Sequence, residues 1–261
     1  MTYSDPEYVT IQYRDASKLN ARIALHQRFS TNPQGLSRWI LDQFDLPKQS
    51  RLLEVGCGPG RLWTENLDSL PEEWSITLTD ASPGMVAEGE ARLGSDRRFE
   101  FRVADASEIP FEEGRFDAVV ANHMLYHVPD RALAIRELRR VLRPGGVLLV
   151  VTNADPHLRE LDNLVVDAGG TVPERTMMKF KMENGGEELR EQFGRVDRHD
   201  FTGELVIPEA GPILDYIASM QTFVTGTDTE LLPVIGERLA TILKVGGEFR
   251  ITTAAGCFVC R

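Results

Sequence analysis

The stretch LLEVGCGPGRLW, residues 52–63, predicts how the central part of this chain folds. An apolar run typical of a buried strand ends at Val55, and a helical pattern begins at Leu62. Three glycines alternate with other residues between these points: Gly56, Gly58 and Gly60. Glycine is selected where φ must be positive or where another group comes close to the backbone. The stretch therefore predicts a strand, a tight turn and a helix, with a ligand or a packed neighbour against the turn.

Strand-like runs and helical patterns alternate from this point onward. Strands are expected near residues 51–56, 75–80, 99–104, 116–121 and 146–152, and helices near 61–70, 83–93 and 130–142. This alternation predicts parallel β-α-β units and an α/β fold, a doubly wound sheet with helices on both faces. Such sheets bind ligands beyond the carboxyl ends of their strands, so we expect the site there.

Segments on both sides of this core are predicted to add to it. Residues 1–48 contain two helical patterns broken at STNP, and residues 155–192, rich in charge, Met and Gly, predict an insertion with helices. Two strands and two helices are expected in the C-terminal part, over residues 201–207, 211–224, 229–244 and 247–260.

The composition is that of an ordinary globular protein, with 42% hydrophobic and 26% charged residues. Lys and Arg number 29 against 40 Asp and Glu, a net charge of −11 that argues against a nucleic-acid partner. No run approaches the roughly 20 apolar residues of a membrane helix, and the first residues lack a signal-peptide pattern. The three cysteines form neither a disulfide framework nor a metal-ligand spacing. We therefore expect a cytoplasmic protein with buried thiols, no metal and no membrane partner.

The glycine turn does not match a phosphate-binding loop. A dinucleotide fingerprint, G-x-G-x-x-G, requires a third glycine at position 61, which is Arg61 here. Pro59 also removes one amide from the start of the following helix, where a pyrophosphate is bound in that fingerprint. A tight strand-to-helix connection without a ligand stays open as an alternative at this point.

Carboxylates at successive strand ends favour a ligand of a different charge. Glu54 lies just inside the first strand, Asp80 closes the second and Asp105 follows the third. Such a set repels a phosphate but suits the hydroxyls of an unphosphorylated ribose. A ligand with a sugar, an adenine and a net positive centre would not be repelled by these carboxylates.

Five motifs carry a family resemblance, in the order EVGCGPG, LTDASPGM, VADASEIPF, FDAVVANHMLYHV and LRPGGVLLV. They resemble the successive motifs of the class I S-adenosylmethionine-dependent methyltransferases, over about residues 50–152. The resemblance is greatest to bacterial small-molecule enzymes with a core domain of the ubiquinone/menaquinone-biosynthesis type. It implies a mostly parallel seven-stranded sheet with an antiparallel last strand, S-adenosylmethionine as cofactor, a small-molecule acceptor, and a monomer or homodimer. Residues 1–48 become a helical lid, 49–261 the cofactor-binding methyltransferase domain, and 155–192 its insertion on the substrate side.

The resemblance also implies a set of cofactor-binding residues: Glu54, Gly56, Cys57, Gly58, Gly60, Asp80, Ala81, Met85, Asp105, Ala106 and Asn122. Within this set Asp80 is expected to bind the ribose hydroxyls and Asp105 the adenine amino group. Asn122 is expected to lie under the sulfonium. Core packing for Met85, and helix caps or turns for the two aspartates, are the structural alternatives.

Two histidines, His123 and His127, are the candidate catalytic residues. They lie four positions apart, so that a helical segment brings them together. A general base, a structural role beside the cofactor and a zinc site are the three interpretations, and zinc is disfavoured because no third ligand is indicated. Arg22 and His26 in the N-terminal segment are the candidate acceptor-binding residues.

The insertion adds a cluster that either lines an apolar pocket or packs on the core: Met177, Met178, Phe180 and Met182. No Pro-Pro follows Asn122, which argues against the signature of many enzymes that methylate amino groups of nucleic acid or protein. Two alternatives to a methyltransferase stay open, a non-catalytic cofactor-binding module and a nicotinamide-dependent oxidoreductase.

Overall fold

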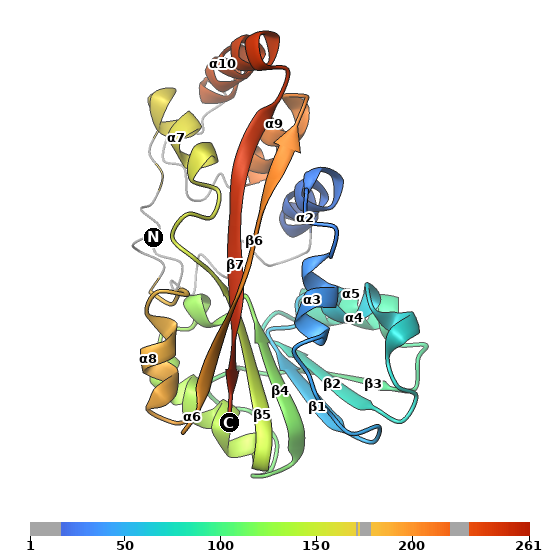
Figure 1. The fold of residues 1–261 in the computed structure, drawn as a ribbon. Helices are drawn as coiled ribbons and strands as arrows, with labels where there is room; N and C mark the ends of the chain where they lie inside the picture. The colour runs from blue at the N-terminus through green and yellow to red at the C-terminus, as the bar shows by residue number, and fades with distance from the viewer. Residues whose placement is uncertain (1–16, 171, 173–178, 220–229) are drawn as a thin grey trace.

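The computed structural model describes residues 17–170, 172, 179–219 and 230–261. Its centre is a seven-stranded sheet in the order β3-β2-β1-β4-β5-β7-β6 (Figure 1). The strands are β1(Arg51–Val55), β2(Ser75–Asp80), β3(Phe99–Val103), β4(Phe116–Asn122), β5(Leu142–Asn153), β6(Val196–Ile207) and β7(Phe249–Cys260). Strands β1 to β5 are parallel, and β7 is antiparallel to both of its neighbours, β5 and β6. The doubly wound sheet with an antiparallel last strand is confirmed.

Helices cover both faces of this sheet and its outer end. They are α2(Ser17–Phe29), α3(Leu36–Leu41), α4(Arg61–Thr64), α5(Pro83–Leu93), α6(Arg131–Val141), α7(Arg159–Asp167), α8(Gly185–Arg190), α9(Gly211–Ser219) and α10(Leu231–Gly246). Two short 3-10 turns, η1(Leu67–Ser69) and η2(Leu125–His127), complete the described elements. Leu53 packs with α6 and α8, and its neighbour Leu52 packs with α3, α4 and α5. Successive side chains of a strand point to opposite faces of the sheet, so both faces of β1 are buried under helices.

Local chemistry starts the two long helices of the parallel core. The Ser82 hydroxyl accepts a hydrogen bond from the Met85 amide at the start of α5. The Asp130 carboxylate accepts one from the Leu133 amide at 2.9 Å at the start of α6. Both are N-caps, which satisfy amides that the first helical turn leaves without a partner.

Three expected elements differ in extent from the observed ones. The helix expected over 61–70 ends after Thr64, and the Asn66 side-chain amide donates to the Leu62 carbonyl at 2.7 Å, a local bond that competes with the helix. Strand β5 starts earlier than expected, at Leu142, because Leu142 already pairs with Phe116 across a register shift in β4. Strand β6 likewise starts at Val196, because it pairs with β7 along its whole length.

The insertion contributes to the core through its later part. Phe180 and Met182 are buried at 0% and 2% exposure in the cluster beneath α6 and α8. Of the two interpretations of this segment, packing on the core therefore applies to these two residues. Met177 and Met178 lie outside the described residues.

Strands β6 and β7 extend beyond the parallel sheet. They pair from Val196 with Cys260 to Ile207 with Phe249, whereas the pairing of β5 with β7 ends at Asn153 with Ala255. The extension packs against α2, α7, α9 and α10 in a separate apolar cluster (Figure 1). Helix α2 thereby lies between this extension and the tips of the parallel strands.

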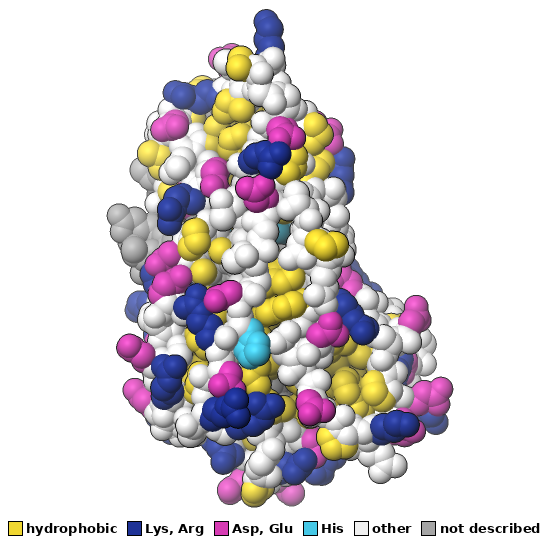
Figure 2. Space-filling model, viewed as in Figure 1, with side chains coloured by type: hydrophobic (Ala, Val, Ile, Leu, Met, Phe, Trp, Pro, Cys, Tyr) yellow, Lys and Arg dark blue, Asp and Glu magenta, His cyan; other side chains and the backbone are white. Residues whose placement is uncertain are grey.

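The surface carries both signs of charge. Figure 2 shows Lys and Arg side chains interspersed with Asp and Glu side chains over the face in view. No helix within the described ranges is long and apolar enough to cross a membrane.

Candidate functional site

A cavity of about 1080 Å³ opens at the carboxyl ends of the parallel strands, where the strand order reverses between β1 and β4. The loops after β1 to β4 form its floor, and α2, α3 and the β6–β7 extension form the opposite wall. Most of the predicted cofactor residues line it: Gly56, Cys57, Gly58, Asp80, Ala81, Met85, Asp105, Ala106 and Asn122. The four predicted residues for acceptor and catalysis also line it: Arg22, His26, His123 and His127. Glu54 and Gly60 lie behind the lining.

All three glycines of the turn have positive φ, between 54° and 74°. A side chain at Gly56 would bring a Cβ within 2.6 Å of the Met124 Cβ, and one at Gly60 within 2.9 Å of Leu93 on α5. A Cβ at Gly58 would meet only Leu19, at 3.8 Å. Gly56 and Gly60 therefore permit close packing within the protein, and Gly58 supplies the backbone conformation alone.

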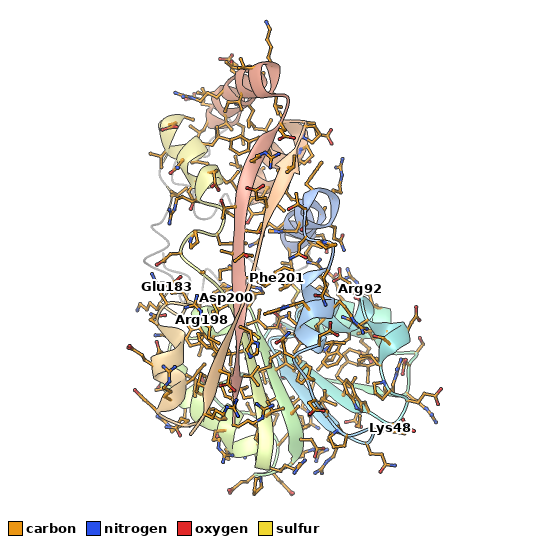
Figure 3. The ribbon with its side chains drawn as sticks, in the orientation of Figure 1. Lys48, Arg92, Glu183, Arg198, Asp200 and Phe201 are labelled. Atoms are coloured by element: carbon orange, nitrogen blue, oxygen red, sulfur yellow. The ribbon has the colours of Figure 1, made fainter. Side chains whose placement is uncertain are left out.

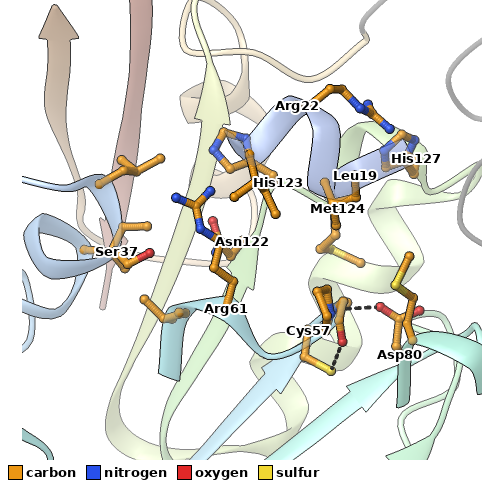
Figure 4. A pocket seen from close by; sticks show the side chains of 18 of the residues that line it. Leu19, Arg22, Ser37, Cys57, Arg61, Asp80, Asn122, His123, Met124 and His127 are labelled. Carbon is orange, nitrogen blue, oxygen red and sulfur yellow. Dashed lines mark hydrogen bonds between the residues drawn. The ribbon is translucent and has the colours of Figure 1, made fainter. Parts of the chain in front are cut away.

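Asp80 ties the glycine turn to the tip of β2. One carboxylate oxygen accepts from the Gly58 amide at 2.9 Å (Figure 4), and the other accepts from the Ser82 amide at 2.8 Å. Burial raises the pKa of Asp80, and these two backbone donors lower it in part. The carboxylate thus forms the turn, which is the structural alternative considered for it, and it also lines the cavity.

Glu54 lies behind the cavity wall, with 1% of its surface exposed. Its carboxylate accepts from the indole nitrogen of Trp63 at 2.6 Å and from the side-chain amide of Asn122. Burial, with a smaller contribution from the charge of Asp80, raises the pKa of Glu54 from 4.5 to about 8. Glu54 therefore acts on the cavity through Asn122.

Asn122 presents an unsatisfied acceptor to the cavity. Its amide nitrogen is committed to Glu54, so its amide oxygen turns the other way. That oxygen is buried and has no hydrogen-bond partner among the described residues. An unpaired buried acceptor costs about 1–3 kcal/mol, so a ligand that donates a hydrogen bond here would be favoured.

The loop after β4 places both candidate catalytic histidines on the lining. His123 has a φ of 54°, in the left-handed region that a non-glycine residue adopts at a cost of about 1–3 kcal/mol. The rings of Tyr126 and His127 meet edge to face at 4.4 Å. Burial, with the charges of His26, Arg61 and His127, lowers the pKa of His123 from 6.5 to about 4. His123 is therefore neutral at pH 7.

Helix α2 supplies Arg22 and His26 from the opposite wall (Figure 4 labels Arg22). The His26 ring stacks on His157, with centroids 5.7 Å apart and an interplanar angle of 7°. Burial and the charge of Arg61 lower the pKa of His26 to about 4. The Nδ1 atom of His157 accepts from the Ala254 amide at 3.1 Å, so the proton of its neutral ring lies on Nε2.

The sequence did not point to several lining residues: Arg61, Glu65, His157, Phe201 and Thr253. Arg61 attracted notice only because it replaces a glycine. Phe201 and Thr253 come from strands β6 and β7 and reach the cavity where the pairing of β5 with β7 ends and the β6–β7 extension begins (Figure 3 labels Phe201).

Comparison with known proteins assigns the central part of the chain. Residues 53–150 match the sequence model of the family described as "Methyltransferase domain". This region has the sequence of a methyltransferase domain. A demethylmenaquinone methyltransferase of Staphylococcus aureus is 32% identical over 120 residues, which are 46% of this chain and 49% of the relative. The chain thus matches about half the length of such curated relatives.

Solved structures share the fold of the methyltransferase domain and most of its additions. A putative methyltransferase from Bacillus halodurans superposes with a TM-score of 0.61 at 18% identity, covering 87% of this chain and 98% of that one. Phosphoethanolamine N-methyltransferase 2 of Haemonchus contortus, in complex with S-adenosylhomocysteine, superposes with a TM-score of 0.60 at 19% identity. The match covers 100% of this chain and 60% of that one. The [4+2]-cyclase SpnF gives 0.62 at 19% identity, covering 97% and 94%.

The residues present fit S-adenosylmethionine, the cofactor of this family. The unpaired oxygen of Asn122 offers an acceptor to a donor group such as an ammonium. Asp80 and Asp105 bring negative charge to the tips of β2 and β3, which suits a cationic ligand and disfavours a phosphate. Asp105 is exposed and accepts from the Ser107 amide at 2.7 Å, whereas Met85 is almost fully buried and reaches the lining from α5.

Proposed function

We propose that this chain is an enzyme that transfers a methyl group from S-adenosylmethionine to a small-molecule acceptor by in-line displacement. One observation carries the proposal: a single cavity joins the Asn122 and Asp80 side of the strand tips to a second compartment under α2. Sites for one small molecule occupy about 300–1000 Å³, and a cavity of about 1080 Å³ leaves room for an acceptor beside the cofactor.

In this proposal the predicted cofactor residues keep their roles, with two changes. Asp80 holds the ribose hydroxyls, Asp105 and Ala106 receive the adenine, and the turn at Gly56 to Gly58 lies against the methionine part. Glu54 acts by orienting the amide of Asn122. Gly60 acts by packing the turn onto α5.

The chain's part in the reaction is to position the acceptor and exclude water. When bound, the cofactor supplies a methyl group that its sulfonium already activates, so orientation is the main requirement. His123 and His127 flank the acceptor side in this proposal. Because His123 is neutral, it adds no positive charge where a cation binds, and it accepts a proton readily only from an acidic acceptor.

We further propose a cytoplasmic, bacterial protein that acts as a monomer or homodimer, with residues 1–48 as a lid and no nucleic-acid or membrane partner. The net charge of −11, the three buried thiols and the bacterial source of the relatives support this setting.

Incubation with methyl-labelled S-adenosylmethionine and a panel of small acceptors tests the activity. We expect label to appear in a small-molecule product and S-adenosylhomocysteine to accumulate in equal amount. Cofactor binding without transfer to any acceptor would instead support a binding module or another reaction, as the fold shared with a [4+2]-cyclase allows.

A further inference from the structure

The part of the cavity under α2, which includes residues of the loops after β1 and β4, differs in charge from the tips of β2 and β3. We call this part the acceptor compartment and define it by Arg22, His26, Arg61, His123, His157 and Phe201. Three carboxylates line the whole cavity within the described part of the chain, namely Glu65, Asp80 and Asp105, and the two aspartates belong to the tips of β2 and β3. Glu65 is therefore the one carboxylate on the acceptor side.

Hydrogen bonds within the protein already engage Glu65. Its Oε1 accepts from the Arg61 Nε at 2.7 Å and from the Gln27 side chain at 2.8 Å, and the Ser37 hydroxyl donates to it as well. Burial raises the pKa of Glu65, but these donors outweigh it and the net pKa is lowered, so Glu65 is ionised and already accepts from three side chains. The one carboxylate of the compartment is therefore already engaged by side chains of the protein.

Arg61 retains binding capacity toward the cavity. Its Nε is bonded to Glu65, and within the described ranges neither terminal nitrogen of its guanidinium has a hydrogen-bond partner. Figure 4 shows the guanidinium between the side chains of Asn122 and His123. A guanidinium edge of this kind binds a carboxylate through charge-assisted hydrogen bonds.

Arg61 lies close to histidines on both sides of the compartment. After burial, its positive charge contributes to the lowered pKa of His26 on α2 and of His123 after β4. Phe201 adds an apolar surface, since its ring lies 5.1 Å from that of Trp39 and lines the cavity.

We infer that the acceptor is a small organic acid, with its carboxylate on the terminal nitrogens of Arg61 and an apolar body toward Phe201. This inference rests on the proposed function, because it assumes that the other side of the cavity holds the cofactor.

Binding to protein saturated with S-adenosylhomocysteine tests the inference, because the carboxylate of that ligand is then already in place. The probes are matched aromatic compounds: a panel of benzoates and phenylacetates, their uncharged amides, and benzylamine. We expect acids to raise the melting temperature and to bind at least tenfold more tightly than their amides in calorimetry, with no binding of benzylamine. Equal binding of acid and amide, preference for the amine, or no shift with any acid would overturn the inference.

Variants separate the acceptor from the cofactor. Arg61→Gln/Glu65→Gln removes both charges of the pair and should weaken acid binding at least tenfold, while the affinity for S-adenosylhomocysteine stays within threefold. Arg38→Gln is the matched control, since Arg38 pairs with Asp42 on the exposed side of α3 and is absent from the lining. A loss of S-adenosylhomocysteine affinity with acid binding unchanged would assign Arg61 to the cofactor and overturn the inference. Failure of the unmodified protein to bind S-adenosylhomocysteine would instead refute the proposed function.

Discussion

Replacing Glu54 with glutamine should change how the stability of the cofactor-free protein depends on pH. The folded protein raises the pKa of Glu54 from 4.5 to about 8, whereas the unfolded chain keeps the ordinary value. Between these pH values the folded state holds one proton more than the unfolded state. The free energy of unfolding therefore falls as pH rises, by about 1.4 kcal/mol per unit, or on the order of 5 kcal/mol over the interval.

Glutamine is uncharged throughout this range and resembles the protonated carboxyl. The Glu54→Gln variant should therefore lose less stability with rising pH than the unmodified protein. The melting temperature of the variant minus that of the unmodified protein should therefore increase by on the order of 10 °C between pH 5 and pH 8. Titrating groups that do not interact with Glu54 contribute equally to both proteins, so the difference between the two curves reports Glu54 together with Asp80, whose charge interacts with it.

Thermal unfolding followed by circular dichroism at half-unit pH steps gives this difference directly. Glu73→Gln is the matched control, because Glu73 is exposed and no described group bonds to it; its curve should run parallel to that of the unmodified protein. Parallel curves for Glu54→Gln and the unmodified protein would refute the assignment of a buried, protonated Glu54.

Three further changes follow from the same contacts. Asp80→Ala should weaken S-adenosylhomocysteine binding at least tenfold in calorimetry. It should also cost about 1–3 kcal/mol of stability, because the Gly58 and Ser82 amides lose their acceptor. Unchanged affinity would exclude Asp80 from the cofactor site. Gly56→Ala should lower the free energy of unfolding, measured in urea, by at least about 2 kcal/mol and clearly more than Gly58→Ala does. Both variants bear the cost of positive φ, but only Gly56→Ala adds a 2.6 Å clash with Met124. Equal effects would contradict the packing role of Gly56. His123→Asn should keep the melting temperature within a few degrees, because asparagine tolerates the left-handed backbone. If His123 is a catalytic base, this variant also loses the dependence of turnover on a group that titrates near pH 4.

The sequence was sufficient for the parts of the fold that local pattern controls. Alternating strands and helices predicted the parallel core, and acidic residues at strand ends placed Asp80 and Asp105 at one edge of the sheet. Parallel strands align their carboxyl ends, so this inference needs no knowledge of distant contacts. The N-caps at Ser82 and Asp130 are likewise local.

Long-range pairing determined what the sequence left open. The long pairing of β6 with β7 brings Phe201 and Thr253 to the cavity, and no local pattern indicates how far two strands so distant in the sequence pair. Glu54 was expected among the cofactor-binding residues, and the contacts that hold it behind the cavity wall, with the indole of Trp63 and the amide of Asn122, were not predicted. Arg61 pairs with Glu65 one helical turn later through its Nε atom alone. The spacing of the two residues permits this ion pair, but it does not show that the terminal nitrogens of Arg61 stay available.

Calorimetric titration of the unmodified protein with S-adenosylmethionine, with NAD as the comparison ligand, bears most directly on the central claim. The account predicts saturable binding of one S-adenosylmethionine per chain and no heat of binding for NAD. Binding of NAD, or none of S-adenosylmethionine at millimolar concentration, would contradict it.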